Sequence, residues 1–423
     1  MTQINTRKGY GFPLFLIGCL FFIFGFITWA NSQLIPYLKI ACELTDSESY
    51  LVATAFFAAY FVMAIPSSMI LNKIGYKKGM SLGLFVMAIG AVLFIPAAES
   101  RNYPLFLTGL FIIGTGLALL QTASNPYVAV LGPMESAAKR ISIMGICNKV
   151  AGILAVYTLG SITLSNADEL IARLKVITPA EKAIELNQLA HKVVMPYTIV
   201  AIALAALAIA LLFVHLPEIR EEESSDTAIA FSADKTSILH FPHLLLGALA
   251  IFFYVGVEVI SYDTFARFGQ ALGYPLETAK TFASYTGYGL LVGYVFGIVA
   301  IPKFISQRTA LLSFTFLSMA LVLLAVFTKG NVAVFCFALL GFSNSVMWPA
   351  IWPLAITGLG RFTKIGAALL VMNIVGGAVL PPLYGKLSEA LHNPQMAYLL
   401  MIPCYLYILF YAVSGYKAGM KIK

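Results

Sequence analysis

Two acidic side chains lie within one long apolar segment of the sequence, where ionised groups are energetically expensive. The segment 241–269 contains Glu258 and Asp263, five residues apart. A helix turns by about 100° per residue, so these carboxylates point in different directions unless the helix breaks near Gly256. An acid at membrane depth is a candidate to bind Na⁺ or to carry a proton. The alternative is an ion pair with Lys149, which lies in another apolar segment.

Amide side chains in the apolar segments could bind a neutral, hydroxyl-rich ligand. Gln121 and Asn125 are four residues apart in the segment 104–131, hence on one face of a helix. An amide offers both donors and acceptors, which suits the hydroxyl groups of a sugar. Structural hydrogen bonding is an equal alternative for the further candidates, which are Asn148, Asn373, Asn31, Gln33 and Tyr262.

Tryptophans accompany an amide in the segment 331–358, which contains SNSVMWPAIWP at 343–353. Asn344 and Trp348 share one helix face, and Trp352 follows one turn later. Aromatic faces that stack on the apolar side of a pyranose, with amides at its edge, make a sugar site. The alternative is a belt of tryptophans at the membrane surface, which the neighbouring prolines disfavour.

The composition excludes a soluble protein. Of 423 residues, 60% are hydrophobic and 11% are charged, whereas a soluble domain carries about 25% charged residues. The net charge of +8 is spread over short gaps between apolar runs rather than along one basic stripe. We therefore expect a lipid bilayer as the surroundings and no nucleic-acid partner. The sequence contains no HExxH, GxSxG, P-loop or dinucleotide glycine motif, so we expect neither an enzyme nor a cofactor.

The apolar segments predict an all-α membrane protein with twelve transmembrane helices. A bilayer core of about 30 Å requires about 20 apolar residues per crossing, and backbone groups in lipid must be satisfied within each helix. The predicted spans are 12–38, 48–72, 78–98, 104–131, 138–165, 193–215, 241–269, 279–301, 309–328, 331–358, 363–390 and 396–416.

Two hydrophilic stretches divide this pattern. Residues 166–192 are amphipathic and predict a structured outer loop, whereas 216–240 are rich in charge and predict a cytoplasmic linker. The predicted domains are an N-terminal six-helix bundle at 1–215 and a C-terminal six-helix bundle at 241–423. Lys and Arg favour the two ends and the even-numbered loops, which predicts that both termini are cytoplasmic.

The two bundles contain corresponding sequences. FFIFGFITWANS begins at Phe21, and FFYVGVEVISYD begins at Phe252. Asn148 and Asn373 are each followed four residues later by a glycine. Such a six-plus-six parallel repeat, related by a pseudo-two-fold axis, is typical of the major facilitator fold.

A longer block resembles a known family. LLQTASNPYVAVLGPMESAAKRISIMGICNKVAGILA at 119–155 closely resembles the fucose–galactose–glucose:proton symporter family of the major facilitator superfamily. The glucose/galactose transporter branch is the better match, which the segments 21–31, 35–44 and 254–264 also support. The resemblance implies a multi-pass sugar transporter of the bacterial cytoplasmic membrane that works by alternating access.

Two positions depart from the proton-coupled fucose branch of that family. This chain has Gln121 and Ser32 where that branch has a glutamate and an aspartate, and neither side chain carries a proton at ordinary pH. The resemblance to sodium-dependent carriers implies Na⁺ as the coupling ion. Asp263 and Glu258 are then the acidic candidates for a Na⁺ site near Asp263, with Lys149 as a possible counter-ion.

These observations predict a monomeric carrier that takes up a hexose such as glucose or galactose together with a cation. The monosaccharide would bind near the midplane between the two bundles. Three alternatives remain: a proton-coupled fucose or deoxyhexose symporter, an uncoupled uniporter, and a sugar sensor that transports nothing. The sensor class usually carries a large cytoplasmic domain, for which this sequence has no segment.

Overall fold

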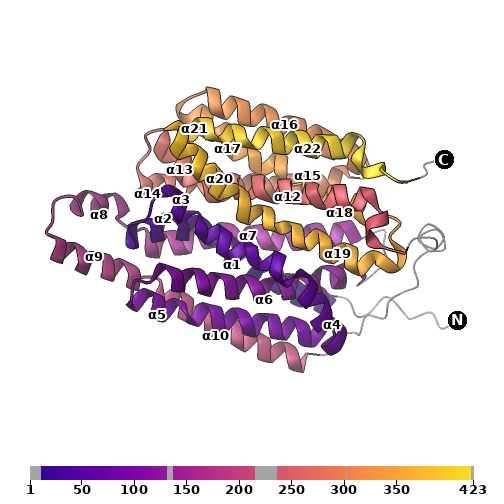
Figure 1. The fold of residues 1–423 in the computed structure, drawn as a ribbon, viewed down its shortest axis with the longest axis horizontal. Helices are drawn as coiled ribbons and strands as arrows, with labels where there is room; N and C mark the ends of the chain where they lie inside the picture. Colours follow the sequence, from indigo (N-terminus) through magenta and orange to yellow (C-terminus); the bar gives the residue numbers. More distant parts are fainter. Residues whose placement is uncertain (1–10, 131–136, 215–235, 302, 421–423) are drawn as a thin grey trace.

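The computed structural model describes residues 11–130, 137–214, 236–301 and 303–420, and these residues contain helices but no strand. Figure 1 shows the helices side by side in two groups, with the N-terminal half below and the C-terminal half above. The all-α prediction is therefore confirmed. Most of the predicted linker 216–240 lies outside the described residues.

The N-terminal half contains the helices of the first six predicted spans and of the predicted outer loop. They are α1 (Gly11–Trp29), α2 (Asn31–Ala41), α3 (Asp46–Ser49), α4 (Leu51–Val92), α5 (Phe94–Glu99), α6 (Tyr103–Val130), α7 (Ala137–Thr163), α8 (Ala167–Arg173), α9 (Pro179–His191) and α10 (Val194–Phe213).

The C-terminal half contains the remaining helices and several 3₁₀ turns. They are η2 (Ile238–His240), α12 (Pro242–Asp263), α13 (Phe265–Ala271), α14 (Leu276–Ala279), α15 (Phe282–Ala300), α16 (Gln307–Phe327), α17 (Gly330–Asn344), α18 (Met347–Ile356), η3 (Gly360–Phe362), α19 (Thr363–Met372), η4 (Asn373–Val375), α20 (Gly376–Leu391), α21 (Pro394–Ala397), η5 (Tyr398–Leu400), α22 (Met401–Val413) and η6 (Gly415–Lys417).

The second and third predicted spans are joined more tightly than the sequence suggested. The described residues form eleven helical stretches long and apolar enough to cross a membrane, and one of them includes α4 with 42 residues. A straight helix of that length would measure about 63 Å, twice the bilayer core of about 30 Å. Within α4, Gly75 alone has non-helical angles, with φ 77° and ψ 169°. A positive φ is cheap for glycine, so the chain turns there and crosses again as the twelfth span.

Several other predicted spans are interrupted, among them the first, the tenth and the eleventh. The first divides into α1 and α2 at Ala30, and the tenth divides between Asn344 and Met347 into α17 and α18. The eleventh contains the 3₁₀ turn η4 between α19 and α20. Such interruptions are tolerated at membrane depth where the backbone is enclosed by protein or faces a cavity.

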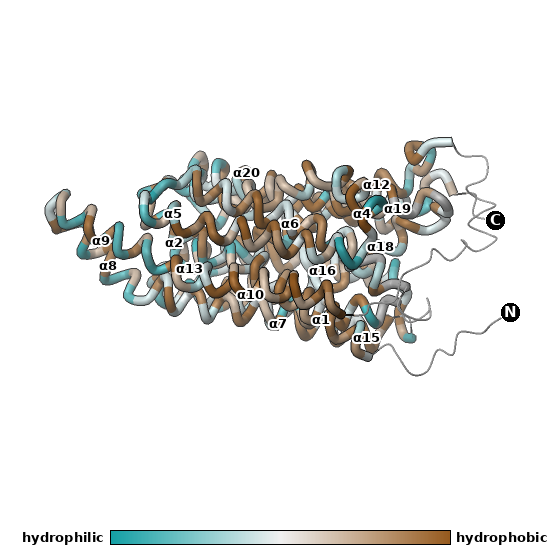
Figure 2. Tube along the Cα trace, turned by 90° about the horizontal axis from the view of Figure 1, so that it is seen from below, coloured by the Kyte–Doolittle hydropathy of each residue, from teal (hydrophilic) through white to brown (hydrophobic). Residues whose placement is uncertain are grey.

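The outer loop predicted at 166–192 is helical. Thr178 accepts a hydrogen bond from the backbone N–H of Glu181 and forms a capping box at the start of α9. The hydroxyl of Tyr37 donates to the carbonyls of Leu189 and Ala190, at 3.1 and 2.8 Å, and ties α9 to α2. Figures 1 and 2 show α8 and α9 projecting beyond one end of the bundle, and Figure 2 shows more hydrophilic residues there than along its middle.

The two halves are linked by polar contacts at the end where α8 lies. A carboxylate oxygen of Asp46 lies 2.6 Å from a guanidinium nitrogen of Arg267. The two carboxylate oxygens of Asp168 accept the backbone N–H groups of Leu276 and Glu277, at 2.9 and 2.7 Å. This end of the bundle is therefore closed by contacts from α3 to α13 and from α8 to α14.

Further contacts strengthen the same closure around Lys280. Its ammonium group donates to the carbonyl of Leu164 at 3.0 Å, and its own carbonyl accepts the amide of Gln33 at 2.9 Å. The backbone N–H of Ser47 donates to the carboxylate of Glu389 at 2.8 Å. The closure thus joins α2, α3, α8 and the segment between α7 and α8 to the opposite half.

Candidate functional site

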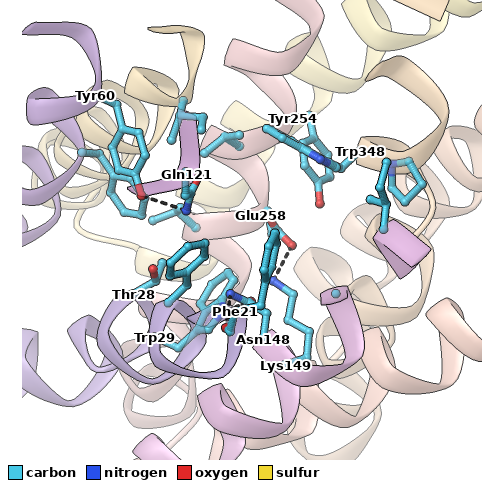
Figure 3. Close-up of a pocket in the computed structure, with 18 of the residues that line it drawn as sticks. Phe21, Thr28, Trp29, Tyr60, Gln121, Asn148, Lys149, Tyr254, Glu258 and Trp348 are labelled. Atoms are coloured by element: carbon cyan, nitrogen blue, oxygen red, sulfur yellow. Dashed lines mark hydrogen bonds and ion pairs between the residues drawn. The ribbon is translucent and has the colours of Figure 1, made fainter. Parts of the chain in front are cut away.

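A cavity of about 140 Å³ lies between the two halves. Figure 3 shows polar side chains and aromatic rings converging on it from both halves. The N-terminal half lines it with Phe21, Phe24, Thr28, Trp29, Phe57, Tyr60, Gln121, Ile141, Gly145, Asn148 and Lys149. The C-terminal half contributes Tyr254, Val255, Glu258, Val259, Tyr294, Trp348, Pro349 and Ile374.

Close packing of α1 on α7 positions one amide of the cavity. The indole N–H of Trp29 donates to the side-chain oxygen of Asn148 at 3.0 Å. A Cβ atom on Gly25 would lie 1.8 Å from the carbonyl oxygen of Asn148, and one on Gly152 would lie 2.6 Å from the Trp29 ring. Both glycines are therefore required for this approach. The side-chain oxygen of Asn148 is fixed by Trp29, whereas its NH₂ group makes only a long bond of 3.5 Å to the carbonyl of Phe21.

Gln121 reaches the cavity from α6. Its side-chain NH₂ donates to the hydroxyl of Tyr60 on α4 at 3.1 Å, as Figure 3 shows. The predicted partner on the same helix face, Asn125, has a side chain that lies outside the described residues. Gln121 and Asn148 are thus the predicted amides that the structure brings to the cavity.

The two tryptophans of α18 occupy different positions. Trp348 lines the cavity, and the ring of Trp352 stacks on it with centroids 5.2 Å apart and an interplanar angle of 28°. The ring of Tyr254 on α12 lies 6.3 Å from that of Trp348. Trp348 could therefore contact a ligand directly, whereas Trp352 supports it from behind.

Glu258 and Lys149 form an ion pair across the cavity. The ammonium nitrogen of Lys149 lies 3.0 Å from a carboxylate oxygen of Glu258, and both residues are buried. The same nitrogen lies 3.8 Å from the centroid of the Trp29 ring, where a cation–π contact stabilises its charge. The ion-pair alternative drawn from the sequence is confirmed for Glu258, and the pair joins α7 of one half to α12 of the other.

Asp263 has a different environment, although it belongs to the same helix. It is the last residue of α12, which passes without a break through Gly256, and it is 3% exposed. Among the described residues, no group donates a hydrogen bond to either of its carboxylate oxygens. No cluster of three or more His, Cys, Asp or Glu side chains that could hold a metal occurs in the described part of the chain. Asp263 is therefore a solitary buried carboxylate.

Several other predicted contacts lie behind the cavity wall. Asn344 is fully buried, and its oxygen accepts the hydroxyl of Tyr405 at 2.9 Å. Asn373 donates to the carbonyl of Leu369 at 2.9 Å, one turn earlier on its own helix. These contacts favour the structural alternative for both amides.

The remaining predicted residues lie near the contact between α2 and α12. Gln33 donates to the backbone of Lys280, as described above. Asn31 is fully buried, and both polar atoms of its amide lack a described partner. The ring of Tyr262 lies 4.1 Å from that of Trp29. None of these side chains lines the cavity.

The sequence did not point to four polar residues that line the cavity. They are Thr28, Tyr60, Tyr254 and Tyr294. A tyrosine in an apolar run is as suitable for a helix interface as for a ligand site, so spacing alone carries no signal. Only the convergence of spans from both halves distinguishes these residues from other buried tyrosines.

Comparisons with known proteins agree with this architecture. The Major Facilitator Superfamily profile matches residues 17–381. A protein named glucose/galactose transporter from Brucella abortus is 36% identical over 421 residues, covering 99% of this chain and 97% of that protein. An L-fucose-proton symporter from Escherichia coli is 32% identical over 412 residues, covering 96% and 94%.

A solved structure is also similar. The crystal structure of the major facilitator transporter FucP in the outward conformation has 31% sequence identity and a TM-score of 0.75. The match covers 95% of this chain and 98% of that one. The D-xylose-proton symporter, at 18% identity and a TM-score of 0.66, shares the fold.

Proposed function

The chain belongs to the major facilitator superfamily and is a multi-pass sugar transporter, and on that premise we propose that it takes up a hexose such as glucose or galactose with a cation. Its relatives are transporters rather than enzymes and need no cofactor. The observation that carries the proposal is the cavity between the halves, where amides and aromatic rings converge.

The chemistry of the cavity suits a pyranose. The NH₂ groups of Gln121 and Asn148 can donate to hydroxyl oxygens, and the hydroxyl of Tyr60 can exchange its bond to Gln121 for one to the sugar. The faces of Trp29 and Trp348 offer stacking surfaces for the C–H side of the ring. Asn125, whose side chain lies outside the described residues, stays a predicted contact.

The closed end of the bundle supports alternating access. With the contacts of Asp46 and Asp168 formed, the halves are held together at the end where α8 lies. Opening at that end requires these contacts to break, while the cavity stays at the same interface. We propose that this end faces outward from a bacterial cytoplasmic membrane, with both termini in the cytoplasm and the carrier acting as a monomer.

The coupling ion has two candidates. The sequence resemblance implies Na⁺, since neither Gln121 nor Ser32 can carry a proton. Proton coupling is the second candidate, because the Escherichia coli relative is named an L-fucose-proton symporter. Both candidates require a group in this chain that binds a cation reversibly.

The test is uptake of radiolabelled glucose, galactose and fucose into proteoliposomes with separately imposed Na⁺ and pH gradients. Accumulation of glucose or galactose under one of the gradients is expected. Accumulation driven by Na⁺ alone would establish sodium symport, and accumulation driven by pH alone would establish proton symport. Uptake that merely equilibrates under both gradients would identify a uniporter, and absence of any sugar flux would refute the proposal.

A further inference from the structure

Two carboxylates of α12 lie five residues apart, and the structure distinguishes them by what neutralises each one. Glu258 faces the ammonium group of Lys149 at 3.0 Å, so its negative charge is neutralised in this conformation. Asp263 has no described hydrogen-bond partner on either oxygen. Of the two buried acids among the described residues, it is the one with neither an ion pair nor a hydrogen bond to its carboxylate.

We propose that Asp263 is the group that takes up and releases the coupling cation, and that Glu258 is not. This inference rests on the proposed symport and assigns its coupling step to one residue. A buried carboxylate is costly when ionised and unpaired. In the conformation described here, Asp263 must therefore be neutralised, by a proton on one oxygen or by Na⁺ beside both.

Other buried polar atoms without a described partner belong to α2 and α12. They are the hydroxyl of Tyr262, the residue before Asp263, and both amide atoms of Asn31 on α2. The ring of Trp29, two residues before Asn31, packs on the ring of Tyr262. Amide and hydroxyl oxygens are atoms of the kind that bind a cation beside a carboxylate.

The charged and ionisable groups close to Asp263 are few. They are Glu258 and Tyr262 on α12, Lys149 on α7, and Tyr50 at the start of α4. Lys149 is already paired with Glu258, and the two tyrosines are neutral near pH 7. A change of charge at Asp263 is therefore not compensated by an opposite change on these neighbours. It shifts the equilibrium between the conformations of the carrier instead.

This arrangement links cation binding to movement. The conformation with the α8 end closed buries Asp263 at 3% exposure, so it is favoured when the carboxylate is neutralised and opposed when it is bare. A cation that binds Asp263 thus shifts the carrier toward this conformation, and by linkage the conformation binds the cation more tightly. Accumulation of sugar against a gradient follows if the carrier that holds sugar but no cation cannot complete this closure.

The test compares Asp263→Asn with wild-type carrier in proteoliposomes. Gradient-driven accumulation should be lost in the variant. Counterflow, in which labelled sugar exchanges for unlabelled sugar without net cation movement, should stay within about threefold of wild type, because the amide is permanently neutral. The matched control is Glu99→Gln, which neutralises an exposed carboxylate at the end of α5 and should accumulate sugar normally.

Each outcome decides the proposal. Asp263→Asn that accumulates sugar as wild type does would overturn it, and so would loss of counterflow in a variant that still binds sugar. If Asp263→Asn does not fold, Asp263→Glu is the second variant. The cation concentration that gives half-maximal accumulation, Na⁺ or H⁺, should differ from the wild-type value by at least about threefold. An unchanged concentration would overturn the proposal. The effective gradient, Na⁺ or pH, identifies the cation. A wild-type carrier without counterflow would instead refute the sugar-transport function itself.

Discussion

The amides of two corresponding spans, the fourth and the tenth, lie in opposite surroundings. Gln121 in the N-terminal half lines the cavity and has one hydrogen bond, to Tyr60. Asn344 in the C-terminal half is fully buried and bonds to Tyr405, with weaker contacts at 3.3 and 3.4 Å to two serines. Each of the two spans therefore contains an amide, but only Gln121 faces the cavity.

The two halves accordingly contribute different chemistry to the cavity. The N-terminal half supplies the amides of Gln121 and Asn148 and the cation of Lys149, whereas the C-terminal half supplies Glu258 and the ring of Trp348. The wall of the cavity is therefore chemically asymmetric between the two halves. Four predictions test this division of labour, in order of decreasing expected effect.

The largest effect is expected where the halves meet, at the ion pair of Lys149 and Glu258. Lys149→Met leaves the Glu258 carboxylate buried without its partner, which should cost about 3–5 kcal/mol of unfolding free energy. The double variant Lys149→Met/Glu258→Gln removes both charges and should recover most of that loss. Unfolding of the purified carrier by SDS in mixed micelles measures the difference.

The double-variant comparison also separates charge from shape. If Lys149→Met alone is as stable as the double variant, the pair does not neutralise Glu258. That result would also remove the contrast between Glu258 and Asp263 on which the coupling argument depends.

The second effect concerns Asn344, whose removal should act on stability. Asn344→Ala leaves the hydroxyl of Tyr405 and neighbouring serine hydroxyls without their buried partner. Hydrogen bonds between membrane helices contribute about 0.6 kcal/mol on average, so we expect a loss of about 1–3 kcal/mol. Sugar affinity of the folded fraction, measured by equilibrium binding, should change less than about twofold. A large loss of sugar affinity with unchanged unfolding stability would show instead that Asn344 binds the sugar.

The contrast between these amides also marks what the sequence could predict. The twelve spans followed from hydropathy because lipid requires each segment to satisfy its own backbone. The rarity of intramembrane acids singled out Glu258 and Asp263. The period of one helix shows which residues share a face, but the direction of that face is set by its neighbours. Asn344 therefore appeared equivalent to Gln121 until α16 and α22 were seen to enclose it.

Local breaks were likewise beyond the sequence pattern. Hydropathy predicted a loop between the second and third spans, whereas the structure needs only Gly75 with its positive φ. The ion pair of Glu258 was one of two alternatives, because Lys149 is distant in the chain and only the packing of α7 on α15 and α18 of the opposite half brings the two side chains together. Closure of the α8 end depends on contacts between segments with no sequence relation to one another.

The third effect is expected at Gln121, where removal should act on affinity. Gln121→Ala removes a donor from the cavity wall and should weaken hexose binding by about three- to tenfold, equivalent to about 0.7–1.4 kcal/mol. Stability should change little, because the side chain is half-buried and its partner Tyr60 also faces the cavity. Isothermal titration with the transported sugar gives the affinity. Equal losses of affinity in Gln121→Ala and Asn344→Ala would contradict the asymmetry of the halves.

The smallest effect is expected at the closed end, where Asp168 joins α8 to α14. Its carboxylate lies at the rim of the bundle, so water and salt weaken its bonds to the backbone N–H groups of Leu276 and Glu277. Asp168→Asn keeps the shape of the side chain but replaces one acceptor oxygen by an NH₂ donor. One of the two backbone N–H groups then faces a donor and loses its hydrogen bond. Opening at this end should then become easier by about 0.5–1 kcal/mol, which shifts the equilibrium roughly two- to fivefold.

Spin labels at Lys175→Cys on one half and Lys329→Cys on the other, in a background without native cysteines, report the opening as a distance distribution. Both positions are exposed. The matched control is Glu169→Gln, an adjacent exposed carboxylate that should leave the distribution unchanged. If Asp168→Asn also leaves it unchanged, closure is held by the other contacts at this end, those of Asp46, Ser47 and Lys280. The helical outer loop would then not act on the opposite half. If longer distances between the two labels become more populated, the outer loop helps to hold the closed end together. It can do so because α9 is bonded to the N-terminal half while α8 binds the C-terminal half.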